Sequence, residues 1–183
     1  MGPGTLSPGT PLTVCVTNSN VWMTNIAAFA TASNTMALSF SVQGGVPSLL
    51  YDVYATANLM PGSITNAQWY WIGQVSTCGR YTLSNLPPTT VQVVLGSPQD
   101  DDLDGLPNAF EGLVSKTDPE NPSTGGSGLL DGWLYAYYGS ATANVDPYSL
   151  CPSGDGWTLL QASQNGWDPK DWHTPPPPKN VPC

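Results

Sequence analysis

The sequence predicts a mainly β protein, with an N-terminal antiparallel β-sandwich followed by a loop-rich segment with short helices and a Pro-rich tail. Six stretches rich in Val, Tyr, Trp and Thr are separated by Gly, Pro and Asn clusters. Charge is uneven, because the first 99 of 183 residues hold one acid, Asp52, and one base, Arg80. Beyond them short helical patterns replace the alternation of apolar and polar residues. We expect domains at 1–97, 98–172 and 173–183.

The expected strands share β-branched and aromatic residues bounded by turn residues. They span 11–17, 35–45, 49–56, 68–75, 78–84 and 90–96. In the second of them the apolar positions alternate with small or polar ones: Met36, Leu38, Phe40 and Val42 on one side, and Ala37, Ser39, Ser41 and Gln43 on the other. This period of two is typical of a half-buried antiparallel strand. Six such runs favour a small β-sandwich.

A weak repeat runs through the second half. Each copy opens with a Gly-rich loop, continues into a short helical pattern and closes on Asp-Pro, at Asp118, Asp146 and Asp168. The expected helices lie at 107–116, 129–139 and 157–166. Repeats of this kind bury surface mainly against their neighbours, so we expect cross-links or metal to stabilise the segment.

The first loop, 100–111, fits the pattern D-x-[DN]-x-[DN]-G-x5-E of a calcium loop. Alternate side chains of a tight loop can point at one centre, Gly105 permits the turn, and calcium takes six to eight oxygen ligands. The expected ligands are the carboxylates at positions 1, 3, 5 and 12, a carbonyl at position 7 and an indirect ligand at position 9: Asp100, Asp102, Asp104, Glu111, Leu106 and Asn108. The alternative is a solvated acidic turn, in which the crowded carboxylates would repel one another.

The stretch from 100 to 133, "DDDLDGLPNAFEGLVSKTDPENPSTGGSGLLDGW", resembles secreted bacterial proteins with thrombospondin type 3-like calcium repeats. The resemblance implies a preceding β-sandwich. Pro107 stands where a true EF-hand carries an aliphatic residue, so the likeness is to the loop and not to a paired EF-hand.

The second and third copies have lost most of the acidic residues at the metal positions. These hold Ser123, Gly125 and Ser127 in one copy, and Cys151, Ser153 and Asp155 in the other. We therefore expect one strong calcium site, to which Asp118 or Asp131 could add an oxygen. A disulfide through Cys151 could replace the ion in the third copy.

Four cysteines and a scarcity of Lys and Glu fit an exported, oxidised protein at the cell surface or outside the cell. We expect bridges Cys15–Cys78 and Cys151–Cys183; free thiols in a cytosolic protein are the alternative. The first residues lack the pattern of a secretion signal, so we expect such a signal to have been removed or to lie upstream.

Other classes are disfavoured. Four scattered basic residues and a net charge of −9 argue against nucleic acid, and no stretch has the roughly 20 apolar residues of a membrane span. The single histidine, His173, lies beside a proline run and has no evident nucleophile, so we expect no enzyme. Zinc is disfavoured because the sequence has no Cys pair at zinc spacing and no His cluster.

Carbohydrate binding is the rival function. Trp69 and Trp71 would share one strand face, and flat aromatic rings bind sugars, although core packing is the commoner use of this pattern. The leading interpretation is a calcium-stabilised secreted structural protein that assembles with copies of itself into an extracellular filament. The alternative is a carbohydrate-binding or adhesion module of a larger bacterial surface protein.

Overall fold

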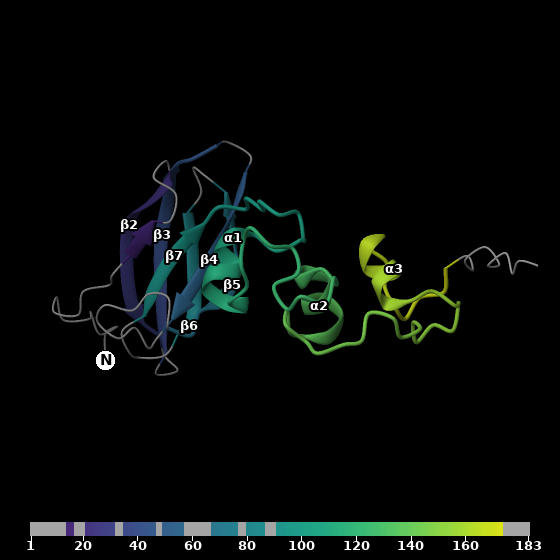
Figure 1. Ribbon diagram of the computed structural model, residues 1–183. Coiled ribbons are helices and arrows are strands. Elements are labelled where there is room, and N and C mark those ends of the chain that lie inside the picture. The colour runs from purple at the N-terminus through teal and green to yellow at the C-terminus, as the bar shows by residue number, and fades with distance from the viewer. Residues whose placement is uncertain are drawn as a thin grey trace, which may run out of the picture. The chain divides into compact units, whose positions relative to one another are not determined.

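The computed structural model describes residues 14–16, 21–31, 35–46, 49–56, 67–76, 80–86 and 91–173. The chain divides into two compact units (Figure 1). The first comprises residues 1–99 and 107–116, and the second comprises residues 100–106 and 117–183. The acidic loop therefore belongs with the second unit, whereas the helical residues that follow it belong with the first. Among the described residues, no helix is long and apolar enough to cross a membrane.

The described strands of the first unit form two β-sheets. Their strands are β1 (Val14–Val16), β2 (Val21–Ala30), β3 (Met36–Gly44), β4 (Leu50–Thr56), β5 (Tyr70–Ser76), β6 (Arg80–Leu86) and β7 (Gln92–Gly96). One sheet has the order β1-β7-β4-β5 and the other β2-β3-β6. All pairings are antiparallel except that of β1 with β7, which is parallel. The mainly β character expected from the sequence is thus confirmed.

Both sheets contribute to one hydrophobic core. Leu38, Phe40 and Val42 of β3 are buried in the same cluster as Val53 of β4 and Leu95 of β7. The inward alternation expected for β3 is confirmed at these three positions. Ala37 and Ser39 were expected to face outward but are also buried. β3 lies between two other strands, and the Arg80 guanidinium donates a 3.0 Å hydrogen bond to the Ser39 hydroxyl.

β2 was not expected from the sequence. This strand is at an edge of its sheet, and its pairing with β3 shifts register between Thr24 and Ala27. Asn25 within the shift has a left-handed backbone, with φ of 51°. Such a bulge interrupts the alternation of apolar and polar residues that predicts a strand.

The opposite face of the four-stranded sheet is covered by a short helical segment. It consists of α1 (Asn108–Phe110) and the π-helical η1 (Glu111–Ser115), where the sequence predicted a helix at 107–116. Leu113 packs with Tyr54 and Trp69 in a second cluster. Gly96 permits this approach, because a Cβ there would lie 2.7 Å from the Ala109 Cβ.

The described part of the second unit, which ends at residue 173, contains the helices α2 (Asp131–Tyr138) and α3 (Leu159–Gln164), within the ranges expected from the sequence (Figure 1). Leu129, Trp133, Leu134, Leu159 and Ala162 form its small core. Cys151 is buried beside them and is a free cysteine, so the expected bridge to Cys183 is not seen. Cys78, Cys183 and the side chain of Cys15 lie outside the described residues, as does the Pro-rich stretch after His173.

Candidate metal site

The acidic loop is folded by its own carboxylates. Asp100 accepts hydrogen bonds from the backbone N–H groups of Leu103 at 2.8 Å and Gly105 at 3.0 Å. Asp104 Oδ1 accepts from Leu106 N–H at 2.7 Å. The backbone is left-handed at Leu103 and at Gly105, with φ of 61° and 98°. These turns gather the aspartate side chains on the inside of the loop.

The other two loops have the same backbone form. Position 4 is left-handed in each of them, at Gly126 and Gly154, and so is position 6, at Gly128 and Gly156. Leu103 stands at position 4 of the acidic loop, where the other loops have glycine. The acidic loop therefore has the left-handed backbone at position 4 with a leucine, although glycine adopts this conformation most readily.

The side chains that close the loops differ in charge. In the second loop, the hydroxyl of Ser123 accepts from Gly128 N–H at 3.0 Å, which is the bond that Asp100 makes in the first. In the third loop, Asp155 Oδ1 accepts from Trp157 N–H at 3.1 Å, which matches Asp104 and Leu106. Serine hydroxyls thus fold the second loop without crowded carboxylates.

The described residues contain two groups of acidic side chains that could hold a metal ion. One consists of Asp100, Asp102 and Asp104, and the other of Asp104, Glu111 and Asp131. Within each group, one carboxylate oxygen from each residue lies within 4.8 Å of those of the other two. Asp104, Glu111 and Asp131 are buried, with exposed fractions of 4%, 0% and 0%. Such a set of hard oxygen atoms is typical of a calcium or magnesium site.

Asp131 adds an oxygen that the motif does not contain. It is the first residue of α2, and its Oδ2 accepts from Thr124 N–H at 2.9 Å. Its Oδ1 is buried and has no hydrogen-bond partner in the structure. Next to it, Gly132 N–H donates to Asp104 Oδ2 at 3.1 Å. Asp104 therefore takes the place of an N-cap for α2, whose own N-cap residue, Leu130, has no side-chain cap.

Electrostatics of the loop favour a bound cation. Burial raises the pKa of Asp104 to about 6, backbone N–H donors oppose this shift, and the charges of Asp102 and Asp131 add to it. Burial also raises the pKa of Asp102, with contributions from Asp100 and Asp131. Asp102 Oδ2 is a second buried oxygen without a hydrogen-bond partner. A buried, unsatisfied carboxylate oxygen is costly, and a cation would relieve both the desolvation and the repulsion.

The remaining expected ligands lie outside the two acidic groups. Leu106 is buried directly after the loop glycine, and Asn108 begins α1, with its N–H donating to the Gln99 carbonyl at 2.8 Å. Asp118 is exposed and lies outside both acidic groups. Its Oδ1 accepts from Glu120 N–H at 3.2 Å, closing the turn at Asp-Pro. Of the two additional candidates, the structure therefore favours Asp131.

The candidate sugar-binding tryptophans differ in exposure. Trp69 is 3% exposed and packs in the cluster with Tyr54, whereas Trp71 is 48% exposed. Trp71 Nε1 donates to Asp52 Oδ1 at 2.7 Å, and Gln74 Nε2 donates to the same oxygen at 3.1 Å. Trp69 and Trp71 therefore do not form a pair of exposed rings, and of these two residues only Trp71 exposes an aromatic surface.

Two features were not anticipated. Gly132 brings α2 close to the acidic loop, and the only sequence signal for it was an Asp-Gly pair at 131–132. His173, expected to be an isolated residue in the tail, contacts Asp155 and Trp167 in the third loop region. No sequence pattern links those three positions.

Comparisons with known proteins provide no further guide. No family model matches the chain, and neither a curated protein nor a solved structure is detectably similar to it.

Proposed function

We propose that this protein is a calcium-stabilised structural protein of the cell surface or extracellular space, made of a β-sandwich and three loop-helix repeats. One calcium ion would be held by the carboxylates of the acidic loop and of Asp131, with oxygens from Leu106 and Asn108. The ion would neutralise the crowded acids and hold the loop against α2. It would have a structural and not a catalytic role.

The observation that carries this proposal is the buried Oδ1 of Asp131. This oxygen has no hydrogen-bond partner, and the Asp131 carboxylate lies within 4.8 Å of Asp104. A merely solvated acidic turn would place its carboxylates in water, where each oxygen could be hydrated. Calcium fits better than magnesium, because the site offers many protein oxygens and magnesium usually keeps several waters.

The test is thermal unfolding of chelator-treated protein with and without added calcium. Binding to the folded state contributes RT ln(1 + [L]/Kd), which is about 2.7 kcal/mol at a hundredfold excess over Kd. For a chain of this size that free energy raises the melting temperature by roughly 5–10 °C. The same melting temperature in chelator and in calcium would reject a stabilising ion.

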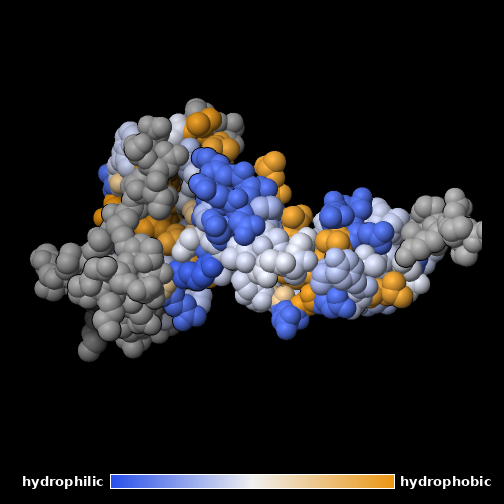
Figure 2. Space-filling model, viewed as in Figure 1, coloured by the Kyte–Doolittle hydropathy of each residue, from blue (hydrophilic) through white to orange (hydrophobic). Residues whose placement is uncertain are grey.

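Assembly with copies of itself is the second part of the proposal. The first 99 residues carry two charged side chains, and one of them, Asp52, is 3% exposed. The edge strand β2 exposes Trp22, Ile26 and Phe29, by 47%, 39% and 44%. Figure 2 shows hydrophobic surface among the strands of this unit. A surface with little charge and an apolar strand edge favours association between chains.

Sedimentation velocity and electron microscopy over a range of protein concentrations test assembly. We expect concentration-dependent filaments or oligomers with calcium present, and their loss in a Trp22→Lys, Phe29→Lys double variant. Trp172→Lys is the matched control, because Trp172 is 64% exposed but lies in the second unit. A wild-type chain that stays monomeric at every concentration would reject the assembly.

Carbohydrate binding is retained as a second candidate because of Trp71. Its ring is about half exposed and is held in place through Asp52, and a fixed aromatic face suits a sugar ring. A glycan array should then show binding that Trp71→Ala abolishes and Trp22→Ala leaves intact. Equal signals for the two variants would argue against this site.

A further inference from the structure

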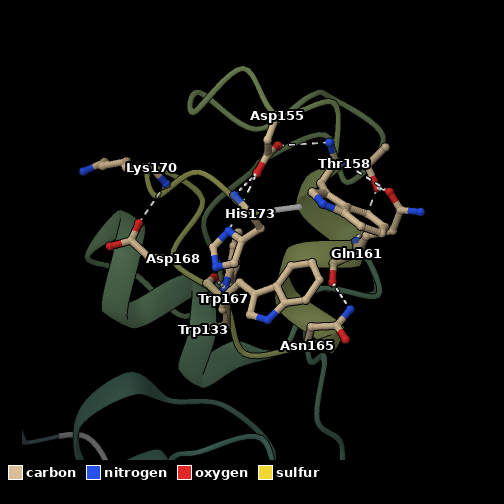
Figure 3. A network of polar contacts seen from close by, with 10 residues as sticks. Trp133, Asp155, Thr158, Gln161, Asn165, Trp167, Asp168, Lys170 and His173 are labelled. Atoms are coloured by element: carbon tan, nitrogen blue, oxygen red, sulfur yellow. Dashed lines mark hydrogen bonds and ion pairs between the residues drawn. The ribbon is translucent and has the colours of Figure 1, made fainter. Parts of the chain in front are cut away.

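The third loop holds a buried carboxylate in contact with the only histidine of the chain. Asp155 is 5% exposed, and its Oδ2 accepts a hydrogen bond from the backbone N–H of His173 at 3.0 Å. The imidazole Nδ1 of His173 lies 3.7 Å from the same oxygen. These residues are 18 positions apart in the chain, so the contact ties residues 168–173 back to the third loop (Figure 3).

A tryptophan supports the other side of the imidazole. The rings of His173 and Trp167 are stacked, with centroids 4.6 Å apart and planes at 13° (Figure 3). Trp167 is itself fixed, because its carbonyl accepts from Trp133 Nε1 at 2.7 Å and its ring packs edge-on against Trp157. We refer to Asp155, Trp167 and His173 together as the histidine clamp.

Both partners of the imidazole attract a cation. Asp155 carries a negative charge, and the face of an indole ring attracts a cation placed over it. Burial acts to raise the pKa of Asp155, but the N–H groups of Trp157 and His173 and the charge of His173 bring it below its usual range. Asp155 therefore stays ionised through the range in which a histidine changes its charge.

The other ionisable groups near the clamp do not replace Asp155 as the negative charge beside the imidazole. The buried thiol of Cys151 has a pKa raised by burial and by Asp155, so it stays neutral. Asp168 Oδ1 accepts from the backbone N–H of Lys170 at 2.8 Å, and Lys170 and Asp171 are exposed. The carboxylate in direct contact with the imidazole is that of Asp155.

We propose that protonation of His173 tightens the histidine clamp, so that residues 168–173 are held more firmly to the third loop at pH 5 than at pH 8. The clamp would use a proton where the first loop is proposed to use calcium, since each supplies positive charge to a buried aspartate. The two devices lie in different loops, and the clamp does not depend on the proposed metal site.

Hydrogen exchange of the His173 backbone N–H, followed by NMR in excess calcium, tests the clamp. After correction for intrinsic exchange, we expect its protection to rise about two- to fivefold from pH 8 to pH 5, as a newly formed cation–π contact would allow. The ring protons of the single histidine should show the upfield shift of a stacked ring at both pH values.

Three variants test whether the charge of His173 causes the pH dependence of the protection. His173→Gln should lose the pH dependence of the protection and Trp167→Leu should reduce it, whereas Asp171→Asn, which removes an exposed charge from the same segment, should keep it. Equal protection of the wild-type N–H at pH 5 and pH 8 would overturn the proposal. An undiminished pH dependence in His173→Gln would also overturn it, because another group would then be responsible.

Discussion

The backbone N–H of Gly132 donates a 3.1 Å hydrogen bond to Asp104 Oδ2, although the two residues are 28 positions apart in the chain. A Cβ on Gly132 would meet the carbonyl oxygen of Asp104 at 2.5 Å, closer than such atoms can approach. The start of α2 and the acidic loop therefore pack at a spacing that glycine alone permits. Calcium binding and the position of α2 are expected to be coupled through this contact.

Gly132→Ala should accordingly destabilise the protein by about 1–3 kcal/mol, as overpacked sites do, and should weaken calcium binding. Gly125→Ala is the matched control, because a Cβ there meets nothing within 4 Å. Urea unfolding and a calcium titration of both variants are the measurements. If the two alanine variants have the same stability and the same calcium affinity, the close approach of α2 to the acidic loop affects neither property.

The metal-free protein should lose stability as the pH rises through about 6. Asp104 has a pKa of about 6 in the folded chain, against 3.8 as its ordinary value. The contribution of Asp104 to the free energy of unfolding is thus complete below pH 3.8. It is lost as the Asp104 carboxyl group of the folded protein gives up its proton near pH 6. Urea unfolding in chelator at pH 4.5 and pH 7 should show this loss. The loss of stability between pH 4.5 and pH 7 should be smaller in Asp104→Asn. An equal loss in this variant would mean that other groups cause it.

Asp131→Asn should reduce calcium affinity at least about tenfold, since charge and ligand count set the affinity of such sites. In chelator the same variant should be as stable as the wild type or more so, because an unsatisfied charge is removed. Asp118→Asn is the control on an exposed turn and should leave the affinity unchanged. Competition with a chromophoric chelator measures all three proteins. Equal affinity for Asp131→Asn and wild type would exclude Asp131 as a ligand.

Thr158 forms a capping box with Gln161 at the start of α3. Its hydroxyl accepts from the Gln161 N–H at 3.3 Å, and the Gln161 side chain accepts from the Thr158 N–H at 3.0 Å. Thr158→Ala should cost about 1 kcal/mol, measured by urea unfolding, whereas Thr158→Ser should restore most of it. No difference between alanine and serine would mean that the cap contributes little.

The mainly β fold and the helical segments were predictable because local patterns determine them. Strands with clean alternation or a bounded apolar run, such as β3 and β7, were identified. β2 was not, because its register shift at Thr24 and Ala27 breaks the pattern. The location of the acidic loop followed from the spacing of carboxylates around Gly105, which is local as well.

Relationships between distant positions could not be read from the sequence. Asp118 and Asp131 were equal candidates as additional ligands, and only the fold buries one and leaves the other in an exposed turn. Trp69 and Trp71 are two residues apart, and on a strand this spacing fits a pair of exposed rings as well as rings packed in a core. The packing of Leu113 over the sheet buries Trp69, and a local pattern does not record such a contact.

Isothermal titration of chelator-treated protein with calcium tests the proposed calcium site most directly. We predict saturable binding of one ion per chain, and loss of that binding when Asp100, Asp102 and Asp104 are replaced by Asn. Wild-type protein that shows no saturable binding, or a triple variant that binds as the wild type does, would contradict a calcium site in the acidic loop.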